Sequence, residues 1–282
     1  MQPITELYVE LAERIAARLG SPRVRALHLP PNDANETGFC ALELQDGSIG
    51  LSYIQLEGTE APMRARFGVR DMSDIDAVTL ARGFATSDPV DRALGFAAIN
   101  ALSQQLFTHA NWVPSANENS LGALNPQRGE HIGMIGLFMP LIPIIERSGA
   151  RLTVLELDHA LVRDEANFRV TLDPAELADC SQIVSTCAVM LNDTLDDVLA
   201  ACRKARRFAV VGPTASCVPD PLFARGVDSL GGRRVIEREK FVAAIRSGNK
   251  WGAYASKYVI ARDDYPGIEW LIAQTRKIKI EK

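Results

Sequence analysis

The chain has 282 residues, 47% of them hydrophobic and 23% charged, a composition typical of globular proteins with room for two domains. Its formal net charge of −4 leaves no basic field for nucleic acid, and no apolar run is long enough to span a bilayer, so we expect neither a nucleic-acid nor a membrane partner. The five cysteines are an odd number without a CxxC pair, which favours a reducing, cytoplasmic location over a disulfide framework.

The first hundred residues predict a small α+β unit. Leucine and isoleucine at helical spacing indicate a helix over 7–19, and extended stretches follow at 24–29, 38–44 and 48–56. The last two are joined by Gln45-Asp46-Gly47, which predicts a hairpin because glycine accepts a positive φ.

Two helices complete this unit. A short one is expected over 74–82, and a long one begins at Ser87-Asp88-Pro89, where an N-cap precedes a proline, and runs to about Phe107. The polar stretch 112–129, rich in Asn, Pro, Gly and Ser, predicts a linker.

After the linker, short apolar runs alternate with helical segments. This pattern predicts a parallel sheet covered by helices on both faces. The expected strands are 131–136, 151–157, 182–186, 208–212 and 226–230. The expected helices are 141–148, 194–205, 221–224 and 237–247, followed by a tail that packs on the body. We therefore predict the α/β class: an α+β domain over 1–110, a linker over 111–129, and a Rossmann-like domain over 130–282 with a C-terminal helical tail.

In open parallel sheets, ligands bind at the carboxyl ends of the strands, near the point where strand order reverses. Glycines, hydroxyls, carboxylates and a thiol follow the predicted strands there. The candidate ligand-binding residues are Gly136, Phe138, Glu156, Asp158, Thr186, Cys187, Asn192, Thr194, Gly212, Pro213, Thr214 and Ser216. Asn192 and Thr194 are also expected to cap the helix that follows them.

Several interpretations of these residues stay open. Gly136 and Glu156 suit a dinucleotide site, with the acid on a ribose, but GxxG is only part of that motif and bulky residues follow it. Cys187 and Cys217, with His159, could bind a soft or borderline divalent metal, or Cys187 and Cys217 could be small core hydrophobes. The polar loops 57–60 and 117–120 could roof the site or simply be solvated.

Six segments together resemble one known family. They are GSIGLSYI (47–54), FAAINAL (96–102), GMIGLFMPLI (133–142), LELD (155–158), STCAVMLNDTLDDVL (185–199) and VGPTASCVPDPLFARGVDSLGG (211–232). The family is that of "putative heavy-metal chelation" proteins. The resemblance implies a Rossmann-like C-terminal domain, a preceding domain similar to the enolase N-terminal domain, and a site in the cleft between them. The family's TGTT turn is Ser185-Thr186-Cys187-Ala188 in this chain, and its Ser, Thr and Pro after VGP are replaced by Ser216-Cys217-Val218.

The resulting hypothesis is a small-ligand-binding protein for a metal ion or a metal-chelating small molecule. The rival hypothesis is an enzyme with a nicotinamide or S-adenosylmethionine-like cofactor, which would use Gly136 and Glu156. A third is an interaction module without a ligand. No residue is assigned a catalytic role, and a homodimer is expected from base rates.

Overall fold

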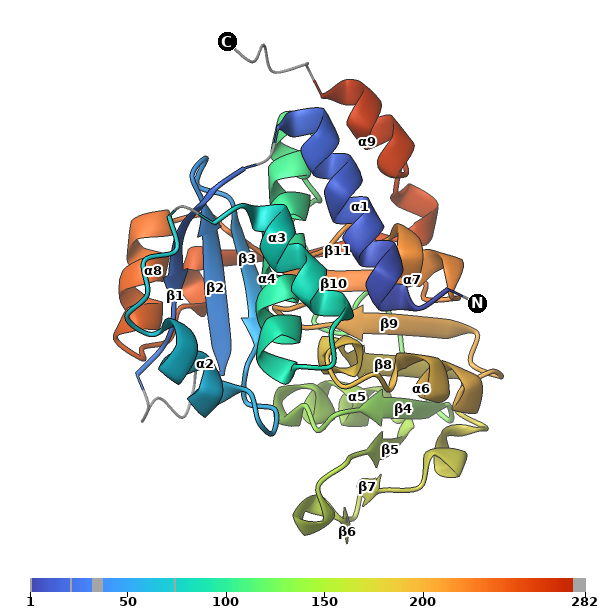
Figure 1. The fold of residues 1–282 in the computed structure, drawn as a ribbon. Helices are drawn as coiled ribbons and strands as arrows, with labels where there is room; N and C mark the ends of the chain where they lie inside the picture. Colours follow the sequence, from blue (N-terminus) through green and yellow to red (C-terminus); the bar gives the residue numbers. More distant parts are fainter. Residues whose placement is uncertain (1, 21, 32–37, 74, 276–282) are drawn as a thin grey trace.

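The structure is a computed structural model that describes residues 2–20, 22–31, 38–73 and 75–275, and it contains two β-sheets (Figure 1). The smaller sheet has three antiparallel strands, and the larger has eight strands that are mostly parallel. Helices cover both. The predicted α/β class, with a small α+β part before a parallel sheet, is confirmed.

The small sheet has the order β1-β2-β3, formed by Val24–His28, Phe39–Leu44 and Ile49–Tyr53. Between β2 and β3, Gly47 has a φ of 89°, and Asp46 Oδ1 accepts a hydrogen bond from the Ser48 N–H at 2.9 Å. The predicted hairpin is therefore confirmed, and it rests on a glycine that tolerates this conformation.

Helix α4 (Pro89–His109) lies between the small sheet and the rest of the molecule (Figure 1). Asp88 caps it by accepting hydrogen bonds from the Val90 and Asp91 N–H groups, as the sequence predicted. The helix is apolar around most of its circumference and is buried on all sides from Ala93 to Phe107. A Cβ on Gly50 of β3 would lie 2.1 Å from Ala97 O, so only glycine lets strand and helix approach this closely.

The large sheet has the order β11-β10-β9-β8-β4-β5-β7-β6. Its strands are β4 His131–Ile135, β5 Arg151–Leu155, β6 Arg163–Asp164, β7 Phe168–Thr171, β8 Gln182–Thr186, β9 Arg207–Val211, β10 Ser229–Val235 and β11 Ala255–Ala261. The edge strands β11 and β6 are antiparallel to their neighbours and the others are parallel. The chain runs from β4 outward through β5 to β7, then returns to β8 on the other side of β4. The strand order therefore reverses between β4 and β8.

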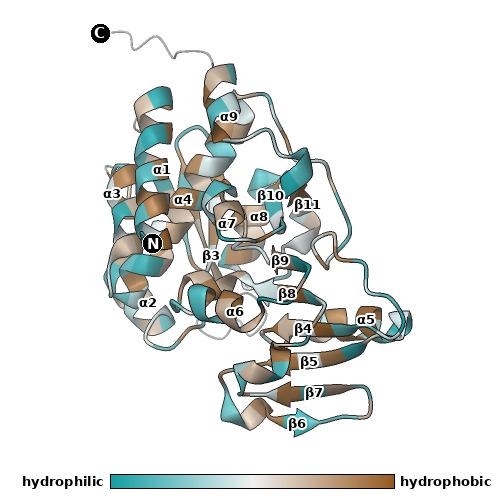
Figure 2. Ribbon diagram, turned by 90° about the vertical axis from the view of Figure 1, so that its right-hand side faces the viewer, coloured by the Kyte–Doolittle hydropathy of each residue, from teal (hydrophilic) through white to brown (hydrophobic). Residues whose placement is uncertain are grey.

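The other helices are α1 Ile4–Leu19, α2 Glu60–Phe67, α3 Ala77–Ala81, α5 Ile142–Ser148, α6 Leu195–Ala201, α7 Asp220–Ala224, α8 Arg238–Arg246 and α9 Ile268–Gln274. Figure 2 shows α1 alternating between hydrophilic and hydrophobic residues, and β6 as a hydrophilic edge strand. In the part of the chain that the structure describes, no helix combines the length and apolarity needed to cross a bilayer.

Among the described α-helices and strands, α2, β6, β7 and β11 were not predicted from the sequence. β6 and β7 are too short to show a periodicity. β11 lies in the tail that was expected to be helical, but its Tyr258 and Ile260 are buried and its intervening residues are half-exposed, the alternation of an edge strand. The predicted short helix over 74–82 is shorter in the structure, and its residue 74 lies outside the described residues.

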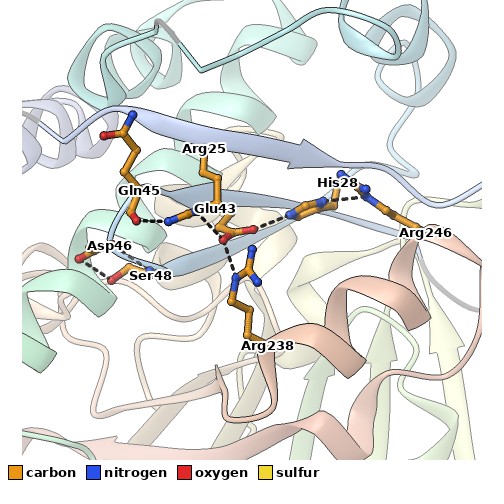
Figure 3. Close-up of polar contacts among 8 residues, drawn as sticks. All are labelled: Arg25, His28, Glu43, Gln45, Asp46, Ser48, Arg238 and Arg246. Carbon is orange, nitrogen blue, oxygen red and sulfur yellow. Dashed lines mark hydrogen bonds and ion pairs between the residues drawn. The ribbon is translucent and has the colours of Figure 1, made fainter.

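A buried charged network attaches α8 to the small sheet (Figure 3). The carboxylate of Glu43 lies 2.6 Å from Arg238 Nε and 2.9 Å from His28 Nε2, and His28 Nδ1 accepts a hydrogen bond from Arg246 Nε at 3.0 Å. Since arginine can only donate, the proton of a neutral His28 is on Nε2 and points to Glu43. The C-terminal half is therefore bound to the N-terminal sheet through complementary charges.

The largest hydrophobic cluster contains residues of both halves, from Tyr8 and Phe96 to Ile183 and Leu230. This core continues across the predicted linker, and the division into domains at 110 and 129 stays a prediction. Polar groups of α4 join the halves as well: Asn100 donates to Thr214 O at 2.8 Å.

Candidate functional site

A cavity of about 630 Å³ opens at the carboxyl ends of β4, β5, β7, β8 and β9, where the strand order reverses. The end of β3 and Phe39 of β2 contribute to the same cavity from the small sheet. It is the place that the topology of an open parallel sheet assigns to a ligand. We call it the cleft.

The candidate residues predicted from the sequence gather there, with one exception. The cleft is lined by Gly136, Phe138, Glu156, Asp158, Thr186, Cys187, Asn192, Thr194, Gly212, Pro213 and Thr214. Ser216 does not line it. Its buried hydroxyl bridges Pro213 O at 2.9 Å and Arg233 O at 3.0 Å, so it holds the loop after β9 against β10.

Gly136 directly follows β4, which pairs with β5 on one side and with β8 on the other. Its φ is 82°, and a Cβ there would lie 3.0 Å from Thr186 Cγ2. Its N–H donates to Leu155 O at 2.9 Å. Glycine is therefore needed both for the conformation and for the close approach of the ends of β4 and β8.

In the turn after β4, the carboxylate of Glu156 accepts a backbone hydrogen bond. The Leu137 N–H donates to Glu156 Oε1, and the Leu157 N–H donates to Glu156 Oε2 at 3.2 Å. The Phe138 N–H is directed at Met134 Sδ at 3.4 Å. A nucleotide-binding turn presents such N–H groups to a phosphate, whereas in this turn the Leu137 and Phe138 N–H groups already have acceptors.

The opposite wall follows β8. Thr186 Oγ1 accepts from the Ala188 N–H at 3.1 Å and so caps η5 (Cys187–Met190). Thr194 is at the N-cap position of α6, as expected, but its hydroxyl donates to Asn192 Oδ1 at 2.7 Å and does not cap a helix N–H. The predicted capping is therefore corrected: Asn192 and Thr194 hold each other, and Asn192 caps nothing in α6.

The roof of the cleft was missed in the sequence. It is formed by Phe39, Tyr53, Gln55 and Leu56, and the Tyr53 N–H donates to Thr214 Oγ1 at 3.0 Å across the two halves. The only sequence signal was the segment 47–54, whose resemblance to the family includes Tyr53.

The polar loops proposed as a roof lie elsewhere. Neither 57–60 nor 117–120 lines the cleft. The second of these loops runs along the edge strand β11, where the Asn117 N–H donates to Lys257 O at 3.0 Å.

Of the predicted metal set, the Cys187 and Cys217 thiols are close enough to interact electrostatically, but in the described chain they form no three-residue metal group with His159. Cys217 is fully buried with its Sγ 3.2 Å from the hydroxyl of Tyr8, and His159 is exposed in η3 (His159–Leu161). Burial raises the pKa of Cys217 to about 12 and that of Cys187 well above its usual range, which opposes formation of the thiolates that bind metals. Within the described ranges, no group of three or more His, Cys, Asp and Glu side chains is arranged to hold a metal ion.

The charge of the cleft has one sign. Its lining includes the carboxylates of Glu156, Asp158 and Asp197, and no Lys, Arg or His of the described chain is part of it. Asp158 also accepts from the Ala160 N–H at 2.8 Å. Burial, and then the charge of Glu156, raises the pKa of Tyr53 in the roof, so Glu156 and Tyr53 share one electrostatic environment.

The chain resembles known proteins in sequence and in fold. The chain is similar to a solved protein of unknown function from Pyrococcus horikoshii, with a TM-score of 0.68 and 18% identity, over 92% of this chain and 100% of that one. It is also similar to one from Desulfitobacterium hafniense, with a TM-score of 0.67 and 20% identity, over 91% of this chain and 99% of that one. These likenesses show the fold.

An uncharacterized protein of Methanocaldococcus jannaschii is 29% identical over 157 residues, 54% of this chain. The match spans 58% of that relative's length. Two family models, both described as "putative heavy-metal chelation", match residues 119–262 and 37–103. The first of them covers half of the chain, so the chain belongs to the family of "putative heavy-metal chelation" proteins.

Proposed function

We propose that the protein binds a small molecule in the cleft, and that this molecule is a chelator carrying a metal ion. The observation that carries the proposal is the cavity itself, which lies at the strand-order reversal and is closed over by the small sheet. About 630 Å³ falls within the range of roughly 300–1,000 Å³ typical of small-molecule pockets. The family description supports a metal as part of the ligand.

A chelate fits the cleft better than a bare ion. The lining offers scattered carboxylates and hydroxyls on a largely apolar surface, and its thiol is buried and protonated. Transition metals need several donors at one point, and the described residues do not converge in that way. An organic chelator would supply those donors and fill the apolar volume.

The rival hypothesis, an enzyme with a nicotinamide or S-adenosylmethionine-like cofactor, has one residue in its favour. Glu156 follows the second strand of the sheet, where an acid can hold a ribose. However, its carboxylate already accepts from the Leu137 and Leu157 N–H groups, so a ribose hydroxyl would have to share the carboxylate oxygens with them. The structure therefore favours the chelate.

Thermal unfolding of metal-stripped protein tests the proposal. The panel consists of Ni²⁺, Co²⁺ and Zn²⁺ alone, the same ions with one equivalent of histidine, which leaves a cationic chelate, and adenine cofactors. A ligand at 100 times its Kd adds about 2.7 kcal/mol, a rise in Tm of several degrees for a chain of this size. Metal chelates are expected to give this rise, and the bare ions are not.

A blocked cleft supplies the control. Ala188 lines the cleft, so Ala188→Phe is expected to abolish the rise in Tm, while Ala253→Phe, at an exposed position of η6 (Gly252–Tyr254), keeps it. A response to adenine cofactors alone would replace the proposal by the rival enzyme. No response to any ligand would overturn both.

A further inference from the structure

We infer that the cleft selects ligands that carry a positive charge and no phosphate, such as an amidine, an amine or a cationic metal chelate. This inference rests on the proposed function, because it concerns the ligand of the same cleft. Two independent observations carry it: the sign of the lining charges, and the occupation of the turn after β4.

The first observation is the lining. Glu156, Asp158 and Asp197 line the cleft from the ends of β5 and from α6, and no cation of the described chain lines it. Charges of one sign in a concave, partly apolar site raise the local concentration of the opposite charge.

Two arginines that contact residues in or next to the lining are paired with other acids. Arg163, beside the rim, lies 3.1 Å from Glu165 and donates to Leu161 O at 3.3 Å. Arg92 of α4 pairs with Asp193, whose backbone is left-handed at a φ of 59°. Neither arginine lines the cleft, so the three carboxylates keep no internal counter-ion there.

The second observation is the turn. In phosphate-binding Rossmann-like sites, free N–H groups after the first strand take the anion. Here Glu156 accepts from the Leu137 N–H and stands where that anion would bind. A phosphate would have to displace a carboxylate and then lie beside its charge, which disfavours it twice.

The remaining surface indicates the body of the ligand. Phe39 and Tyr53 of the roof face a lining that includes Phe138 and Leu161, and Phe39 and Tyr53 form an edge-to-face pair with centroids 5.4 Å apart. Aromatic rings suit flat, apolar groups. The cleft therefore fits a ligand with a flat body and a cationic end.

Three compounds of nearly the same shape test this selection: benzamidine, benzamide and benzoate, which are cationic, neutral and anionic. Methyl-labelled protein is titrated with each, and the methyl resonances of the cleft residues Leu137, Leu161 and Val198 report binding. We expect benzamidine to bind, benzamide to bind more weakly by roughly five-fold, as a half-exposed ion pair allows, and benzoate to bind least.

Variants assign the selection to named charges. Glu156→Gln keeps the acceptor for the Leu137 N–H and removes the charge, so the preference for benzamidine over benzamide should fall from roughly five-fold to roughly two-fold, a loss within the range that one such ion pair supplies. Asp197→Asn should reduce this preference as well. Because Asp197 is not part of the turn after β4, this variant tests the charge selection even if Glu156→Gln disturbs the fold. Asp263→Asn, exposed in η7 (Arg262–Asp264), should leave it unchanged.

The outcomes separate the two claims. If benzoate binds at the cleft methyls as tightly as benzamidine, charge selection is overturned while binding in the cleft stands. If the preference is the same in wild type, Glu156→Gln and Asp197→Asn, these carboxylates do not select the ligand and the inference fails. If none of the three compounds moves those methyls at millimolar concentration, the inference fails, while the metal chelates of the thermal-unfolding panel decide the proposed function separately.

Discussion

Replacement of Glu43 by glutamine tests how the C-terminal helix α8 is held on the small sheet. The Glu43 side chain is 0% exposed, accepts from Arg238 at 2.6 Å and from His28 at 2.9 Å, and forms an ion pair with Arg25 at 3.1 Å. Both carboxylate oxygens accept, so the amide group of glutamine would meet a donor whichever way it turned (Figure 3). The substitution therefore removes a charge and creates a donor–donor contact.

The size of the effect follows from the exposure of the partners. Removing one partner of a fully buried ion pair costs about 3–5 kcal/mol. Here the arginine side chains are 45% and 49% exposed, and water would replace part of what they lose. We expect Glu43→Gln to lower the free energy of unfolding by about 2–3 kcal/mol, or the Tm by about 4–6 °C for a chain of this size.

Urea unfolding followed by tryptophan fluorescence measures this loss, because Trp251 packs on Phe241 of α8 with centroids 5.3 Å apart. Glu57→Gln, at an exposed carboxylate, serves as the matched control and should change stability by less than about 0.5 kcal/mol. If Glu43→Gln stays within about 1 kcal/mol of wild type, the network contributes no net stability and the argument is wrong.

Three further predictions follow from single features. Burial lowers the pKa of His28, although the hydrogen bond to Glu43 opposes this shift. Below about pH 6.5 the unfolded state therefore binds more protons than the folded state, so acidification from that pH should lower the Tm. The fall in Tm should be smaller in His28→Asn. His131, whose pKa burial also lowers, acts in the same direction. Thermal scans of His28→Asn and His131→Asn between pH 7 and 5 separate the two contributions, and a flat wild-type profile would contradict the prediction. Gly50→Ala should destabilise the protein by more than about 3 kcal/mol, because its Cβ would lie 2.1 Å from Ala97 O. In Gly47→Ala the new Cβ meets no atom within 4 Å, so the cost should be about 1 kcal/mol of backbone strain. Equal losses of stability in urea unfolding would contradict the packing argument. All five cysteines are free and buried, so a thiol reagent should label them only after denaturation, and rapid labelling of native Cys187 would show that the cleft exposes it.

The cleft shows where inference from sequence succeeds and where it stops. The strand ends were predicted from apolar runs, so the residues that follow them, Gly136, Glu156, Thr186 and Thr214, could be placed at one edge of the sheet. What their polar groups do could not be predicted, because it depends on neighbours distant in sequence. Thr214 accepts from Tyr53, and the spacing of neither residue indicates that bond.

The cysteines show the same limit. Their wide spacing argued against disulfides, but it does not indicate the surroundings of Cys217, whose thiol lies against the hydroxyl of Tyr8, 209 positions away. Likewise, the long helix from Pro89 was predicted from its cap and its apolar content. Its buried Asn100 was not interpreted, because its partners are Leu51 O and Thr214 O on two other segments.

The sequence by itself determined the α/β class, the parallel strands, the hairpin at Gly47 and the family, because these depend on local periodicity, turn chemistry and ordered motifs. Tertiary structure alone decided that Glu156 fills the turn after β4, that the small sheet roofs the cleft, and that Glu43 and His28 anchor α8. Each of these is a contact between segments far apart in the chain. Such contacts depend on how whole elements pack, and no local pattern encodes them.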